Sequence, residues 1–129
     1  MIIYRKLKIL LVEDNILNQK VVGFHLRKFD YEVIGVTNWR EAMEEFKFNP
    51  PDLVLMDIML PEKNGFEITS EIRDYEKETG QKNRVPIIAL TANTLDNDKV
   101  KCLEAGMDDY LPKPFSPEEL QAAIQQFAK

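Results

Sequence analysis

The sequence predicts an α/β domain of the doubly wound type, (βα)₅, in which parallel strands alternate with helices. Short apolar runs alternate with segments of helical periodicity along the chain. The apolar runs are continuous, as expected for strands that helices cover on both faces. Right-handed crossovers then favour the strand order 2-1-3-4-5. The predicted strands comprise residues 8–12, 31–36, 53–56, 85–90 and 109–111.

The first two helices are predicted from spacing and from capping residues. Residues 15–29 carry apolar side chains near helical spacing. The next helix begins at Asn38, where Asn38 as N-cap and Glu41 three residues later make a capping box. This helix ends before Asn49, which two prolines follow.

The later helices are predicted in the same way. A helix over 66–77 follows a loop at 61–65, and a polar surface loop is expected at 78–84. The next helix, 94–104, is closed by Gly106 at the C′ position. The last helix opens with Ser116-Pro117-Glu118-Glu119, which combines an N-cap, a first-turn proline and a capping-box glutamate.

Composition indicates one soluble globular domain over residues 1–129, with a core at about 6–127. Of the 129 residues, 44% are hydrophobic and 30% are charged. The net charge of -5 argues against direct binding of nucleic acid. Cys102 is the only cysteine, which excludes an internal disulfide, and we expect a buried thiol. The apolar run at 7–12 is too short to span a membrane, and no targeting segment is apparent, so a cytoplasmic location is expected.

Three acidic residues stand at the ends of two predicted strands. Glu13 and Asp14 follow the first strand, and Asp57 follows the third. In this fold the carboxyl ends of these two strands meet at the ligand crevice. Carboxylates about 4 Å apart repel one another by roughly 1 kcal/mol in water and roughly 4 kcal/mol at an effective dielectric of 20. A hard cation relieves this repulsion, and the few oxygen ligands with open positions favour Mg²⁺.

Two further strand ends point to the same crevice. Thr91 follows the fourth strand, and Lys113 follows the fifth. The ammonium of Lys113 can pair with a carboxylate or bind phosphoryl oxygens. A carboxylate nucleophile, a metal ion and a fixed cation together describe phosphoryl transfer through an acyl phosphate.

These motifs resemble the receiver domain of two-component response regulators over residues 6–127. The matching segments are Val12-Glu13-Asp14-Asn15, Leu55-Met56-Asp57-Ile58-Met59-Leu60-Pro61 with Gly65 beyond, Leu90-Thr91-Ala92, and Tyr110-Leu111-Pro112-Lys113-Pro114. The sequences of these motifs are most similar to those of receiver domains fused to hybrid sensor histidine kinases. The resemblance implies a flavodoxin-like fold and a phosphorelay function.

The resemblance also implies a role for each site residue. Asp57 is the expected phosphoacceptor, and Lys113 is expected to bind the phosphoryl oxygens. The metal ligands are expected to be Glu13, Asp14, Asp57 and the backbone carbonyl of Met59. Thr91 and Tyr110 are the expected switch residues. The Lys113–Pro114 peptide bond is expected to be cis.

The resemblance implies a phosphohistidine donor as the partner, either a histidine kinase or a histidine phosphotransfer domain. The isolated chain is expected to be a monomer. Ile16 and Leu17 follow the acidic pair, and a helix cannot bury its whole circumference, so at least one is expected to face a partner. Pro114 and Phe115 complete the expected partner surface. His25, the only histidine, is expected to be an ordinary surface or half-buried residue.

Three other functions are compatible with parts of this pattern. A haloacid-dehalogenase-like phosphatase also uses an aspartyl phosphate, but it needs a second Asp two residues after the nucleophile, where Met59 stands here. A flavodoxin-type electron carrier needs a phosphate loop where Glu13 and Asp14 stand. A receiver that is never phosphorylated and serves only as an interaction platform is the third. The complete acidic site argues against the interaction platform, and we expect a signalling switch rather than an enzyme.

Overall fold

Five parallel strands form one sheet in the order β2-β1-β3-β4-β5, as predicted. The structure is a computed structural model, which describes residues 6–81, 84–92 and 96–127. The strands are β1 (Lys8–Val12), β2 (Glu32–Val36), β3 (Leu53–Asp57), β4 (Ile87–Thr91) and β5 (Asp109–Pro112). The helices are α1 (Ile16–Lys28), α2 (Trp39–Phe48), α3 (Gly65–Thr79), α4 (Asp96–Ala105) and α5 (Pro117–Phe127).

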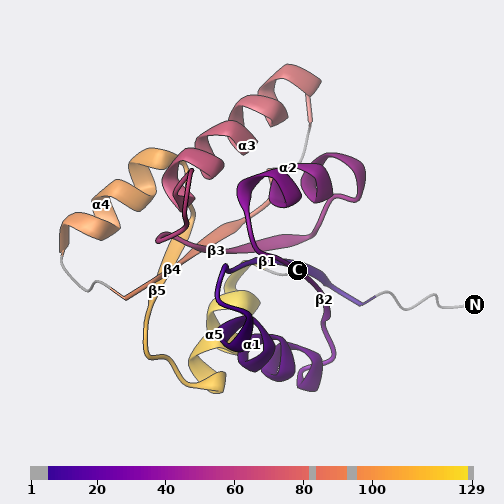
Figure 1. Ribbon diagram of the computed structural model, residues 1–129, viewed down its shortest axis with the longest axis vertical. Helices are drawn as coiled ribbons and strands as arrows, with labels where there is room; N and C mark the ends of the chain where they lie inside the picture. The colour runs from indigo at the N-terminus through magenta and orange to yellow at the C-terminus, as the bar shows by residue number, and fades with distance from the viewer. Residues whose placement is uncertain (1–5, 82–83, 93–95, 128–129) are drawn as a thin grey trace, which may run out of the picture.

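The helices cover the two faces of the sheet unequally. Helices α1 and α5 lie on one face, and α2, α3 and α4 lie on the other (Figure 1). Successive side chains of a strand lie on opposite faces of the sheet, so each continuous apolar run contributes to two separate cores. In β1, Ile9 and Leu11 pack with α1 and α5, whereas Leu10 and Val12 belong to the larger core under the other helices. Cys102 is buried in that larger core, as expected.

Two predicted caps are present, and one differs in detail. Ser116 and Glu119 exchange the two hydrogen bonds of a capping box at the start of α5, each 3.0 Å long. Asn38 accepts a hydrogen bond from Glu41 N as an N-cap. The carboxylate of Glu41, however, accepts from the backbone and hydroxyl of Thr37 instead of from Asn38 N. Helix α3 has an additional capping box that the sequence prediction omitted, between Asn64 and Glu67.

The boundaries of two elements differ from the prediction by more than one residue. β4 begins at Ile87 instead of residue 85, since Val85 N donates to the Glu76 carboxylate and Pro86 has no N–H. α3 continues to Thr79, and Gly80 ends it in the left-handed conformation at φ 66°. The predicted start of the fourth helix at residue 94 lies outside the described residues. Among the described helices, none is long and apolar enough to cross a membrane.

Candidate functional site

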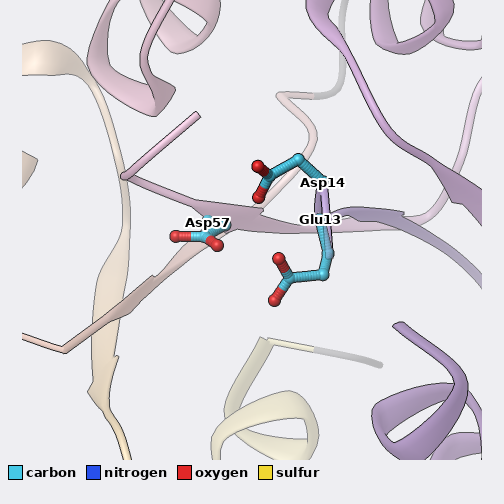
Figure 2. Close-up of side chains that lie close together, drawn as sticks. All are labelled: Glu13, Asp14 and Asp57. Carbon is cyan, nitrogen blue, oxygen red and sulfur yellow. The ribbon is translucent and has the colours of Figure 1, made fainter. Parts of the chain in front are cut away.

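The three acidic residues meet at the carboxyl end of the sheet. Glu13 and Asp14 directly follow β1, and Asp57 is the last residue of β3, the neighbouring strand. One carboxylate oxygen from each residue lies within 4.8 Å of the others. Figure 2 shows the three carboxylates pointing toward the same space between the two strand ends. The parallel register therefore creates the cluster that the strand ends predicted.

Burial differs among the three carboxylates. Glu13 is 1% exposed and Asp57 is 6% exposed, whereas Asp14 lies on the surface. Asp57 Oδ1 accepts a hydrogen bond of 3.0 Å from Met59 N, and Glu13 Oε2 accepts one of 3.1 Å from Asn15 N. The carboxylates of Glu13 and Asp57 are thus buried and oriented by hydrogen bonds, whereas the carboxylate of Asp14 faces solvent.

Lys113 is the one cation that the described residues bring into contact with this cluster. Its Nζ lies 3.3 Å from Glu13 Oε1 and 3.4 Å from Asp57 Oδ2. The lysine follows β5, and the Lys113–Pro114 peptide bond is cis, as predicted. One ammonium therefore faces three carboxylates, so the cluster carries an excess of negative charge.

Burial and the neighbouring charges both affect the protonation of Glu13. Burial raises the pKa of Glu13, and the neighbouring Asp57 carboxylate raises it further, while the hydrogen bond from Asn15 N and the charge of Lys113 act in the opposite direction. A divalent cation would favour the ionised carboxylates by the same electrostatic argument. Oxygen donors that lie close together and lack a balancing charge fit Mg²⁺.

Thr91 and Tyr110 lie on the strands beyond Asp57. Asp57 pairs in register with Leu90, so Thr91 is the next residue along the adjacent strand, and it is buried. The Thr91 carbonyl accepts a hydrogen bond of 2.6 Å from Lys113 N, which links the ends of β4 and β5. Tyr110, on β5, has a half-buried ring that packs at the edge of the larger core. Thr91 thus borders the acidic cluster, whereas Tyr110 lies one strand further away.

The residues of the predicted partner surface are largely exposed, and further exposed apolar residues lie on the same helix. Ile16 is 51% exposed and Leu17 is 69% exposed, Pro114 lies on the surface, and Phe115 is half-buried. A groove of about 350 Å³ beside the site is lined by Leu17, Val21, His25, Pro114 and Phe115, together with Glu13, Asn18, Val22 and Lys113.

The sequence prediction omitted Val21 and Phe24, which are 50% and 61% exposed on the same helix. The sequence could have indicated this, because positions 17, 21 and 24 have the spacing of one helix face, which differs from the face of buried Val22 and Leu26. His25 is half-buried in this helix, which agrees with the ordinary role expected for it.

Two supporting residues hold the loops that carry the carboxylates. The Gln19 side chain donates to the carbonyls of Glu13 and Val36, which ties the start of α1 to the ends of β1 and β2. Gly65 N donates to Ile58 O, and a Cβ at this position would lie 2.6 Å from Asp57 O. Glycine is therefore needed where α3 begins against the end of β3. Gln19 was not predicted to have a structural role, because its partners lie in other elements.

Comparisons with known proteins agree with this geometry. The family model described as the response regulator receiver domain matches residues 9–125. The magnesium-bound receiver domain of the sensor histidine kinase PA1611 from Pseudomonas aeruginosa is 45% identical, with a TM-score of 0.82, and the match covers 95% of this chain and 98% of that one. A similar structure from Saccharomyces cerevisiae is the co-crystal of the phosphotransfer protein Ypd1 with the Ssk1 receiver domain. Its match has 36% identity and a TM-score of 0.86, covering 97% of this chain and 90% of that one.

Curated relatives are longer than this chain. The hybrid signal transduction histidine kinase B of Dictyostelium discoideum is 42% identical over 88% of this chain, which corresponds to 6% of that protein. Other relatives are transcriptional regulators, and the chain spans about half their length, 49% and 47% in two of them. The family match, the sheet order and the acidic cluster lead to the same conclusion. This chain belongs to the response regulator receiver domain family of two-component phosphorelay systems.

Proposed function

We propose that Asp57 accepts a phosphoryl group from a phosphohistidine donor in a Mg²⁺-dependent reaction. The observation that carries this proposal is the buried Asp57 carboxylate, which lies beside two other carboxylates and 3.4 Å from the Lys113 ammonium. In the reaction, an Asp57 oxygen forms a bond to phosphorus while the bond from phosphorus to the donor imidazole nitrogen breaks. Lys113 binds the phosphoryl oxygens, and its contact with Glu13 keeps it at the site before the phosphoryl group arrives.

The proposed ligands of Mg²⁺ are the carboxylates of Glu13, Asp14 and Asp57 and the backbone carbonyl of Met59. When bound, the ion supplies positive charge that offsets the carboxylates and the phosphoryl oxygens. Their clustered oxygens and excess negative charge support this assignment. The exposure of Asp14 leaves one side of the site open to solvent, which suits an ion that keeps several water ligands.

The phosphoryl group is proposed to act through Thr91 and Tyr110. The Thr91 hydroxyl would move to hydrogen-bond a phosphoryl oxygen, and the Tyr110 ring would then take a more buried position. The place of Thr91 next to the end of β3 and the half-buried state of Tyr110 support this sequence of events. The chain is thus a two-state switch, biased by one covalent charge, and not an enzyme with a separate substrate.

The donor is proposed to be a histidine kinase or a histidine phosphotransfer domain that contacts α1. Exposed Ile16 and Leu17 lie on α1, and Leu17, Pro114 and Phe115 line an apolar groove that reaches Glu13 and Lys113 of the acidic site. The yeast Ssk1 receiver domain crystallises with such a phosphotransfer protein, which supports this partner class. We further propose that residues 1–129 form one receiver domain, monomeric when isolated, that does not bind nucleic acid directly. Its proposed location is the cytoplasm or the cytoplasmic side of a membrane-bound hybrid kinase.

Incubation with acetyl phosphate and Mg²⁺ tests the phosphoacceptor. Mass spectrometry should locate one added phosphoryl group on Asp57, and EDTA should prevent the addition. The Asp57→Asn variant should remain unmodified under the same conditions. Modification of that variant at the rate of the unsubstituted chain would refute the assignment.

The Thr91→Ala variant tests the switch separately. It should still be phosphorylated on Asp57, because Lys113 and the carboxylates remain. The NMR signals of the Tyr110 ring should shift on addition of beryllofluoride in the unsubstituted chain but shift less in the variant. An equal Tyr110 response in both chains would exclude this relay while leaving the phosphoacceptor intact.

A further inference from the structure

Trp39, the single tryptophan, contacts a loop that lies far from it in the sequence. It is the first residue of α2, and its Nε1–H donates a hydrogen bond of 2.9 Å to the Glu62 carboxylate, 23 residues later. The ammonium of Lys63 lies over the same indole ring, 4.3 Å from its centroid. The ring also packs against the larger core. Trp39 therefore joins the core to two consecutive residues of the loop between β3 and α3.

This loop begins at the proposed phosphoacceptor. Residues 58–63 connect Asp57 to Asn64, the N-cap of α3. Near its start, Met59 N donates to Asp57 Oδ1, and at its far end Gly65 N donates to Ile58 O. The loop conformation thus sets the position of the Met59 carbonyl and, together with the Lys113 contact, the orientation of the Asp57 carboxylate. A group that fixes the loop also influences both of these ligands.

The loop conformation needs support from neighbouring residues. Glu62 has a φ of 65°, in the left-handed region that residues other than glycine adopt at an energetic cost. Such a conformation persists when several contacts restrain it. Trp39 supplies one through the Glu62 carboxylate, and Lys63 supplies another by pairing with Glu71 of α3 at 2.9 Å. Packing of α2 alone would need only an apolar side chain, so the polar contacts of the indole act on the loop.

We propose that Trp39 is a positioning residue for the metal and phosphoryl site. It holds Glu62 and Lys63, and through them it keeps the Met59 carbonyl and the Asp57 carboxylate in the arrangement that binds Mg²⁺. This inference rests on the proposed function, because it concerns the same acidic site. Helices α2 and α3, which the contact spans, lie on the same face of the sheet (Figure 1).

The test is a Mg²⁺ titration followed by the NMR shifts of the Met59 and Gly65 amides. Trp39→Phe keeps a ring for Lys63 but removes the hydrogen-bond donor, and Glu62→Ala removes the acceptor. Each should raise the Mg²⁺ dissociation constant about threefold to tenfold, as expected for loss of one solvent-exposed hydrogen bond of ordinary strength. The double variant should be no weaker than the weaker single variant, because both remove the same interaction.

Two control variants separate positioning from general damage. Glu62→Gln keeps an oxygen acceptor and should restore the dissociation constant to within about twofold of the unsubstituted value. Arg40→Ala removes the other cation near the ring, 5.5 Å from its centroid, without touching the loop, and should have no effect. Urea unfolding without metal should be measured for every variant. Lower stability with an unchanged Mg²⁺ dissociation constant would overturn the positioning role.

The outcomes also distinguish this inference from the proposed function. If the unsubstituted chain binds Mg²⁺ and both Trp39→Phe and Glu62→Ala bind it equally well, the positioning role alone is wrong. If the unsubstituted chain gives no Mg²⁺-dependent shift at Met59 or Gly65, both the inference and the proposed metal site are wrong.

Discussion

The two ends of the parallel sheet each carry a cluster of charged side chains, and the clusters differ in charge balance. At the carboxyl end, the carboxylates of Glu13, Asp14 and Asp57 form the upper cluster, in which the Lys113 ammonium contacts Glu13 and Asp57. At the amino ends of β4 and β5, two guanidinium groups face two carboxylates. This second group, the lower cluster, consists of Arg73, Glu76, Arg84 and Asp108.

In the lower cluster, the charged side chains are paired with one another by direct contacts. Arg73 pairs with Glu76 at 2.7 Å and with Asp108 at 2.9 Å, and it also donates to the carbonyls of Val85 and Gly106. The carboxylates accept backbone hydrogen bonds as well, Glu76 from Val85 and Asp108 from Ile87. Positive and negative charges therefore balance without an added ion.

The difference separates a structural role from a binding role. Buried charges that are paired and hydrogen-bonded within the chain fix the geometry of α3, β4 and β5 relative to one another. Carboxylates with too few cations leave the folded chain under electrostatic repulsion, which a bound cation can relieve. An unbalanced charge thus indicates the cluster that binds a ligand, although both clusters consist of ordinary acidic and basic residues.

Breaking the lower cluster should have the largest effect on stability. Arg73→Met leaves the largely buried carboxylates of Glu76 and Asp108 without their main partner. We expect the free energy of unfolding to fall by about 3 kcal/mol or more, because removing one member of a buried pair leaves uncompensated charge. Urea denaturation with EDTA present measures this loss.

An exposed ion pair provides the matched control for Arg73→Met. Lys6 pairs with Asp30 at 3.2 Å, but both side chains are more than half exposed, 55% and 60%. Lys6→Met should therefore change the free energy of unfolding by no more than about 0.5 kcal/mol. The increment in stability that Mg²⁺ provides should be the same in Arg73→Met as in the unsubstituted chain, since the clusters share no residue. A loss of less than about 1 kcal/mol in Arg73→Met would contradict this interpretation of the lower cluster.

Neutralising one acid of the upper cluster should have a smaller effect of opposite sign. Asp14→Asn removes one of three repelling carboxylates, so the metal-free chain should become more stable by about 1 kcal/mol. The same variant should gain less stability from Mg²⁺, because it lacks one proposed ligand. Urea unfolding with EDTA and then with Mg²⁺ tests both effects. Lower stability of metal-free Asp14→Asn would argue against mutual repulsion in the cluster.

The sequence predicted the upper cluster but not the lower one, and the topology explains why. Glu13 and Asp57 stand at the ends of apolar runs, and parallel strands bring such ends together. Arg73 lies within a helix and reaches Gly106, 33 residues away, through a side-chain contact. No periodicity or motif marks such a contact. Arg84 belongs to a segment predicted to be a polar surface loop, where an ion pair was not expected.

The same distinction holds for the fold itself. The helices and the caps at Asn38 and Ser116 follow from local patterns, and the strand order follows from the alternation of strands and helices with right-handed crossovers. The start of β4 does not, because a distant carboxylate, Glu76, takes the N–H of Val85. The bond between Trp39 and Glu62 is likewise a long-range side-chain contact that only the assembled fold reveals. Local sequence predicts elements, whereas their boundaries and supporting contacts depend on tertiary structure.

The smallest expected effect is a pH dependence of stability that arises from the raised pKa of Glu13 in the upper cluster. The pKa of Glu13 is raised above its ordinary value of 4.5, chiefly by burial, so the folded chain binds more protons than the unfolded chain between the two values. The contribution of Glu13 to stability is therefore fully present below pH 4.5 and is lost as the pH rises through the raised pKa. Glu13→Gln cannot titrate, so its stability relative to the unsubstituted chain should increase over this range. Urea unfolding with EDTA at a series of pH values tests this, and parallel pH profiles for the two chains would show that Glu13 does not contribute in this way.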